Sequence, residues 1–200
     1  MRISGGESRG RRIAPPRRGG SAGHAGVRPT SDKVREALFS ILGERVKDTV
    51  FLELFAGTGA VGIEALSRGA RRAVFVDSSP GSVRLIRENI ESLGYRERAV
   101  VVSKDALAFL KKTARELGPY DIVFADPPYH ADAGPKAMEL LGSLELSDIF
   151  PEGALAAYEH FKKYPAPESV GRLKKKKKDY LYGDTAVSLY VFAEKNLDSR

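Results

Sequence analysis

Apolar and polar positions along the chain alternate in a way that predicts strands and helices in turn. Short apolar runs have the length of buried strands, and the apolar residues between them recur at helical spacing. The predicted strands are 50–54, 73–76, 100–102, 121–125 and 154–158, and the predicted helices are 60–68, 80–93, 106–117 and 135–147. We therefore expect an α/β fold with a mostly parallel sheet and helices on both faces.

The two ends of the chain break this alternation. Residues 179–182 and 186–192 have only a Gly-Asp-Thr turn between them, so they predict a hairpin that ends the sheet with antiparallel strands. At the other end, residues 1–13 predict a short hairpin that turns at Gly5-Gly6, and residues 14–26 predict a mobile loop.

A further helix is predicted just before the first strand. Thr30 or Ser31 can cap its start, and Asp32 suits its first turn. Its apolar positions fall on one helix face: Val34, Leu38, Ile41 and Leu42. We accordingly divide the chain into a basic N-terminal extension, residues 1–30, and a domain formed by residues 31–200.

The first strand leads into a glycine turn, Gly57-x-Gly59-x-x-Gly62, and a helix follows. Glycines let the backbone approach a ligand where a Cβ would collide, and the helix start offers unpaired N–H groups. Such a turn at the carboxyl end of a parallel strand is typical of a nucleotide site. Sites for NAD, FAD and S-adenosylmethionine all use this pattern, so the turn alone leaves the ligand open.

Acidic residues lie at or just past the ends of four successive predicted strands: Glu53, Asp77, Asp105 and Asp126. The carboxyl ends of parallel strands face the ligand crevice, so these side chains are expected at one edge. Four acids would repel a bare polyphosphate but suit a ligand with hydroxyls, amines and a cationic centre. Asp77 also follows Gly59 at close to the spacing of about 20 residues that is expected for an acid on a ribose diol.

The most specific motif is Asp126-Pro127-Pro128-Tyr129, which follows a predicted strand. The two prolines fix φ and remove two N–H donors, so the turn is rigid and presents carbonyl acceptors. A carboxylate and carbonyls can hold an exocyclic amino group, and Tyr129 can stack on the ring that carries it. The motif therefore predicts a site for an amine-bearing base.

Positive charge is concentrated in two segments of the chain. The net charge is +7, with 33 basic and 26 acidic residues. Residues 1–28 hold seven arginines against Glu7 alone, a net +6, and the run Lys174–Lys178 adds +5, so the remainder is net −4. This distribution favours a polyanion such as nucleic acid as partner, although such segments can also be simply solvated.

Size and composition limit the alternatives. Two hundred residues predict one domain, and no apolar run reaches the roughly 18 residues that a membrane helix needs. The basic N-terminus lacks the apolar stretch of a secretory signal, so a cytoplasmic protein without a membrane partner is expected. There is no cysteine, and His24, His130 and His160 have no ligand-like spacing, so no metal site is predicted.

These motifs resemble those of a known family. Residues 51–59 resemble motif I of class I S-adenosylmethionine-dependent methyltransferases, and Asp126–Tyr129 resembles their amino-methylating motif. The basic start, the block 28–39 and the end block 182–190 are similar to bacterial 16S ribosomal RNA guanine-N2 methyltransferases of the RsmD type. The glycine-rich stretch 17–27 and the lysine run depart from that pattern.

The resemblance implies a Rossmann-like methyltransferase sheet, S-adenosylmethionine as cofactor, and a guanine N2 amine in 16S rRNA of the small ribosomal subunit or its assembly intermediate as acceptor. It implies a monomer. The implied cofactor residues are Glu53 near the α-amino group, Phe55, Gly57 and Gly59 in the loop, Asp77 on the ribose, and Asp105 with Ala106 at the adenine. The implied catalytic residues are Asp126, Pro127, Pro128 and Tyr129.

Three alternatives remain open at this point. An adenine-N6 methyltransferase would share the Asp-Pro-Pro-Tyr motif, and an NAD-dependent oxidoreductase would share the glycine turn and Asp77. A non-catalytic ribosome-assembly factor could keep the fold without the reaction.

Overall fold

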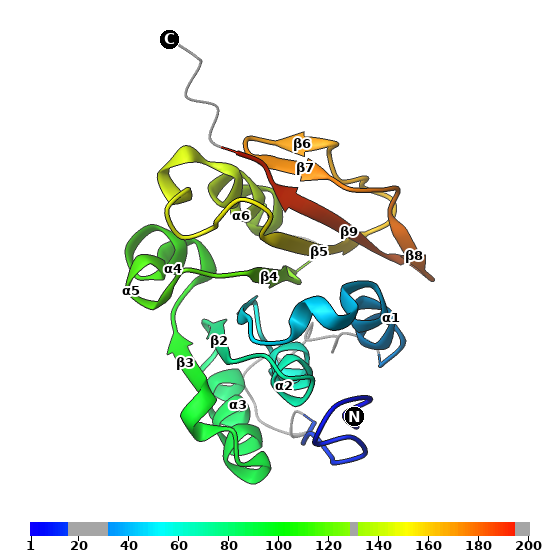
Figure 1. Ribbon diagram of the computed structural model, residues 1–200, viewed down its shortest axis with the longest axis vertical. Helices are drawn as coiled ribbons and strands as arrows, with labels where there is room; N and C mark the ends of the chain where they lie inside the picture. Colours follow the sequence, from blue (N-terminus) through cyan, green and yellow to red (C-terminus); the bar gives the residue numbers. More distant parts are fainter. Residues whose placement is uncertain (16–31, 129–131, 195–200) are drawn as a thin grey trace.

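The computed structural model describes residues 1–15, 32–128 and 132–194. Its centre is a nine-stranded sheet in the order β3-β2-β1-β4-β5-β9-β7-β6, with β8 also paired to β9 (Figure 1). The first five strands are β1 Val50–Leu54, β2 Arg72–Asp77, β3 Ala99–Ser103, β4 Ile122–Ala125 and β5 Leu155–Phe161. The last four are β6 Ser169–Val170, β7 Leu173–Lys175, β8 Tyr180–Tyr182 and β9 Thr185–Phe192. Strands β1 to β5 pair in parallel, and β8 and β9 form the antiparallel hairpin that the sequence pattern predicts. The antiparallel strands β6 and β7 were not predicted.

Helices cover both faces of the sheet, and the buried apolar side chains form two clusters, one on each face. Side chains of α1, α2 and α3 enter one cluster, and side chains of α4 and α6 enter the other. The α-helices are α1 Asp32–Leu42, α2 Ala60–Ser67, α3 Pro80–Leu93, α4 Ala106–Lys112, α5 Ala114–Leu117 and α6 Ala133–Gly142. Short 3₁₀ turns lie at Gly43–Val46, Arg96–Arg98 and Leu144–Leu146. Among the described ranges, no helix combines the length and the apolar character that crossing a membrane requires.

Two predicted helices are shorter in the structure than the sequence pattern indicates. The helix predicted at 106–117 is divided at Thr113, a β-branched residue with φ −122° that ends α4. The helix predicted at 135–147 ends at Gly142, because the chain crosses it there. A Cβ on Gly142 would lie 2.0 Å from the carbonyl oxygen of Val170 in β6.

Residues 1–15 form an arm that reverses direction and packs against the helical layer of α1 to α3. Its two legs meet in an antiparallel bridge between Arg2 and Arg12, and the reversal spans residues 5–10, so it is wider than the predicted Gly5-Gly6 turn. Ile3 and Ile13 are 2% and 1% exposed within the core cluster of α1, α2 and α3. Most of the predicted loop 14–26 and both candidate cap residues, Thr30 and Ser31, lie outside the described residues.

One buried carboxylate fastens the arm to the body. Glu64 of α2 accepts hydrogen bonds from the backbone N–H groups of Ser4 and Gly5, at 2.9 and 2.8 Å. It also forms ion pairs with Arg35, at 3.3 Å, and with Arg68, at 2.9 Å. The side chains of Glu64 and Arg35 are fully buried, so the arm is an integrated part of the fold.

Candidate functional site

The strand register brings the predicted site residues to one edge of the sheet. Leu54 pairs with both Val76 and Ala125, so the chain leaves β1, β2 and β4 at the same level. Neighbouring strands are about 4.8 Å apart. The residues that follow β1 therefore lie between Asp77 on one side and Asp126 on the other.

The turn after β1 is held in a left-handed backbone conformation by local hydrogen bonds. Phe55, Gly57 and Gly59 have φ of 57°, 54° and 72°. The N–H of Gly57 donates to Asp77 Oδ2 at 2.7 Å, and the N–H of Gly59 donates to the carbonyl of Ala56 at 2.7 Å. At Gly62 a Cβ would lie 2.5 Å from the ring of Phe75, so glycine is required for α2 to pack on β2. The glycine turn thus presents bare backbone at the carboxyl edge.

Glu53 is buried beneath this turn, where its carboxyl group binds the start of α2. The group accepts from the N–H of Val61 at 3.3 Å and from the N–H of Gly62 at 2.9 Å. Burial raises the pKa of Glu53 to about 8, because these two hydrogen bonds offset only part of the desolvation, and the charges of Asp126 and Asp77 raise it further. At neutral pH the carboxyl group therefore mostly carries a proton and supports the turn from inside.

Asp77 and Asp105 hold the next two turns of the same edge. Asp77 is half-buried, and besides Gly57 it accepts from the N–H of Ser79 at 2.8 Å. Asp105 is exposed and caps α4, because its Oδ1 accepts from the N–H groups of Leu107 and Ala108 at 3.0 Å each. Ala106 follows it and is buried. Both carboxylates are thus oriented by backbone donors.

The turn after β4 contains the Asp-Pro-Pro motif. Asp126 is half-buried, Pro127 is buried and Pro128 is exposed, whereas Tyr129 lies outside the described residues. The charge of Asp126 raises the pKa of two neighbours, Glu53 in β1 and Tyr158 in β5, so the three groups lie near one another at this level of the sheet.

Tyr158 of β5, the last residue of the predicted strand 154–158, was missed in the sequence analysis; in the structure β5 continues to Phe161, and Tyr158 is level with the carboxyl end of β4. It pairs with Ala125, directly before Asp126. Burial raises its pKa, and the charge of Asp126 adds to the shift. A Cβ on Gly134 would lie 2.5 Å from Tyr158 Oη and 2.7 Å from Pro127 Cγ, so the tyrosine hydroxyl and the proline ring share the space beside α6. The rule that selected the acids, position at the end of a parallel strand, would also have selected this residue.

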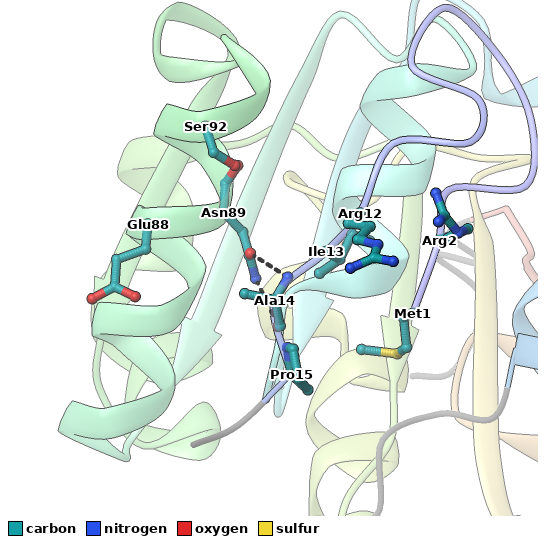
Figure 2. Close-up of a pocket in the computed structure, with 9 residues that line it drawn as sticks. All are labelled: Met1, Arg2, Arg12, Ile13, Ala14, Pro15, Glu88, Asn89 and Ser92. Atoms are coloured by element: carbon teal, nitrogen blue, oxygen red, sulfur yellow. Dashed lines mark hydrogen bonds between the residues drawn. The ribbon is translucent and has the colours of Figure 1, made fainter. Parts of the chain in front are cut away.

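Asn89 of α3 is a second residue that sequence reasoning missed. Its Nδ2 donates to the carbonyl of Thr58 in the glycine turn at 3.2 Å. Its Oδ1 accepts from the N–H of Ala14 in the arm at 2.8 Å, as Figure 2 shows. The side chain is only 2% exposed. It lines an open groove of about 700 Å³ together with Met1, Arg2 and Pro15. One buried amide therefore joins the N-terminal arm to the glycine turn.

His160, the histidine that the structure describes, has a structural role, and the described residues contain no cluster of side chains suited to bind a metal ion. Within the three described ranges, no group of three or more His, Cys, Asp or Glu side chains could hold an ion. His160 Nε2 lies 2.9 Å from Ser188 Oγ in the sheet, and burial lowers the pKa of His160. His24 and His130 lie outside the described residues.

Comparison with known proteins gives consistent matches along the chain. Residues 1–191 match the family model described as conserved hypothetical protein 95. A Bacillus subtilis (strain 168) protein with the provisional name rRNA methyltransferase YlbH is 32% identical over 190 residues, covering 95% of this chain and 98% of that protein. Ribosomal RNA small subunit methyltransferase D of Escherichia coli (strain K12) is 37% identical over 141 residues, covering 70% and 66%.

A solved structure shows the same fold. The Escherichia coli protein yhhF, provisionally described as a methyltransferase, superposes with a TM-score of 0.81 at 29% identity, and the match covers 96% of this chain and 98% of that one. The chain therefore has the methyltransferase fold that the sequence resemblance implied.

Proposed function

Because the chain belongs to the conserved hypothetical protein 95 family, we propose that it transfers a methyl group from S-adenosylmethionine to the N2 amine of a guanine in small-subunit rRNA. The names of its relatives, rRNA methyltransferase and ribosomal RNA small subunit methyltransferase D, support the substrate class. A cytoplasmic location and a monomeric state stay predictions.

The observation that carries the proposal is the adjacency of the two turns. The glycine turn follows β1 and the Asp-Pro-Pro turn follows β4, and these strands are direct neighbours with Leu54 opposite Ala125. A donor bound at the first turn and an acceptor bound at the second would therefore meet in one crevice. An oxidoreductase would leave the second turn unexplained.

The cofactor would lie along the edge from β1 to β3. Gly57 and Gly59 would let its methionine portion approach the backbone, and Phe55 belongs to the same turn. Asp77, already aligned by the N–H groups of Gly57 and Ser79, would bind the ribose hydroxyls. Asp105 and Ala106 would lie at the adenine. Glu53 would act through the shape of the turn, since its carboxyl group binds the start of α2.

The acceptor amine would be oriented by Asp126 and the carbonyl of Pro127, while Pro128 keeps the turn rigid and Tyr129 would stack on the base. Hydrogen bonds from the amine to these acceptors turn the nitrogen lone pair towards the sulfonium methyl. The new N–C bond then forms as the S–C bond breaks, and the nitrogen loses a proton afterwards. The reaction requires positioning more than a strong base, so Asp126 is assigned as an orienting group.

The test is a methyl-transfer assay on small-subunit rRNA and on small-subunit particles, with the product nucleosides identified by mass spectrometry. We expect N2-methylguanosine. N6-methyladenosine would assign the other amine, and absence of transfer to either substrate would favour an assembly factor. The variant Asp126→Ala should lose turnover at least a hundredfold while its affinity for S-adenosylmethionine stays within about threefold. Lost cofactor binding with normal turnover at saturation would contradict the assigned role.

A further inference from the structure

The lysine run interrupts the pairing of the chain with β9, because residues 176–179 lie between the paired strands β7 and β8. β7 and β8 lie one after the other along the same side of β9, with Lys175 opposite Tyr190 and Tyr180 opposite Val187. Four residues, 176–179, therefore face only two on β9, and we call this segment the lysine bulge. A bulge of this kind pushes its extra residues out of the sheet.

Lys175, which directly precedes the bulge, holds it in place. The Lys175 side chain is 4% exposed, and its Nζ lies 2.7 Å from Asp179 Oδ1 and donates to the carbonyl of Ala166 at 2.9 Å. Asp179 also accepts from the hydroxyl of Ser188. Burial alone would raise the pKa of Asp179, but the hydrogen bonds and charge of Lys175, with Ser188, keep this pKa below its usual range. An ion pair between a buried lysine and a partly exposed aspartate therefore closes the bulge at its base.

The three lysines within the bulge are exposed to solvent. Lys176, Lys177 and Lys178 are exposed, and they form no ion pair with any residue that the structure describes. Three positive charges are thus fixed close together on a short pinned segment.

The bulge lies at the same level of the sheet as the Asp-Pro-Pro turn. Ala125 of β4 pairs with Tyr158 of β5, which pairs with Ser188 of β9, and the bulge is opposite Ser188. At strand spacing, three steps across the sheet put the bulge about 14 Å from Asp126. The bulge is therefore level with the Asp-Pro-Pro turn and within reach of a nucleic acid bound at that turn.

An exposed aromatic residue lies in the loop that Lys175 contacts. Tyr164 follows the carboxyl end of β5 and is 63% exposed. Two residues later, the carbonyl of Ala166 accepts a hydrogen bond from Lys175, the residue directly before the bulge. Exposed cations and an exposed aromatic ring on connected segments are groups that can bind single-stranded RNA, through its phosphates and a stacked base.

From this arrangement we infer that the lysine bulge and Tyr164 form a second RNA-binding surface, separate from the N-terminal arm. It contacts the phosphates and one unpaired base of the RNA strand that enters the Asp126 turn. This inference rests on the proposed function for the identity of the RNA, but the surface itself is defined by the bulge.

The experiment measures RNA binding by the full chain in the presence of S-adenosylhomocysteine, with a small-subunit rRNA transcript, over a series of salt concentrations. The variant K176Q/K177Q/K178Q should bind about tenfold more weakly at 0.1 M salt. Its slope of log affinity against log salt should fall by about 2, since each contact with a single-stranded phosphate contributes roughly 0.7. KM for the RNA should rise while kcat at saturation stays unchanged.

The control is K47Q/K111Q/K112Q, which removes three exposed lysines from the opposite edge of the sheet, before β1 and at the end of α4. This variant should keep the wild-type slope. Tyr164→Ala should weaken binding about fivefold, and Tyr164→Phe, which keeps the ring, should not.

Several outcomes would overturn the inference. An unchanged salt slope in the triple variant, with aggregation of the protein, would mean that these lysines only prevent edge-to-edge association. Weaker binding to small-subunit particles with unchanged binding to the transcript would assign the bulge to a protein partner. A wild-type chain that binds the transcript through the bulge but methylates nothing would contradict the proposed function and leave this surface intact.

Discussion

The N-terminal arm and the lysine bulge are both strongly basic in sequence, yet they are fastened to the body in opposite ways. The arm is held by a buried carboxylate of the body: Glu64 accepts from the backbone N–H groups of Ser4 and Gly5. The bulge is held by a lysine of its own run, since the side chain of Lys175 is 4% exposed and pairs with Asp179. The four arginines of the described arm and the three lysines of the bulge are exposed. Both segments therefore keep exposed positive charge, and they differ in the group that anchors them.

The largest predicted effect is the loss of stability when Glu64, the anchor of the arm, is removed. Glu64→Ala should lower the free energy of unfolding by about 3–5 kcal/mol, because it removes the buried partner of Arg35 and leaves it only the exposed Asp32. Lys175→Ala should cost only about 1–2 kcal/mol, since Asp179 is partly exposed and water can replace the lysine. Urea unfolding of both variants measures the difference. A larger loss for Lys175→Ala would show that the bulge, and not the arm, is the more integrated segment.

Glu53 contrasts with Glu64, because it is a buried acid that has no cationic partner in the part of the chain that the structure describes. Its pKa is about 8 in the folded chain against 4.5 when unfolded, so the folded state holds an extra proton between these values. Stability should therefore fall as pH rises from about 5 to about 8, by on the order of 2–4 kcal/mol, and should gain nothing from Glu53 above that range. Glu53→Gln should flatten this dependence, even though its amide nitrogen faces a backbone donor. Thermal unfolding between pH 5 and 9 provides the measurement, and a slope equal to that of the wild type would contradict the assignment.

Sequence reasoning predicted the fold because strands and helices depend on local patterns. The apolar runs and the glycine at position 94 placed strands and helices, and Asp126-Pro127-Pro128 stood out as a rigid turn. It missed Asn89, because the role of that residue comes from contacts across the fold, whereas Tyr158 could have been selected by its position at the end of a predicted strand. Asn89 is one polar residue on a mostly polar helix, and only the structure shows that it is buried between Thr58 and Ala14. The ion pair that pins the bulge was hidden in the lysine run for the same reason, since five identical letters do not show which one is buried.

The smallest expected effect tests whether the arm and the glycine turn are joined. Asn89→Ala removes the donor to the Thr58 carbonyl and the acceptor for the Ala14 N–H, so stability should fall by about 1–2 kcal/mol. If the glycine turn holds S-adenosylmethionine as proposed, the loosened turn should also weaken its binding by about three- to tenfold, as titration calorimetry would measure. Ser92→Ala, in the same helix and groove, leaves the Asn89 amide and its bonds in place and should change neither quantity. A stability loss in Asn89→Ala with unchanged cofactor affinity would mean that the amide only fastens the arm. The arm and the glycine turn would then be structurally connected, but the arm would not affect the free energy of cofactor binding.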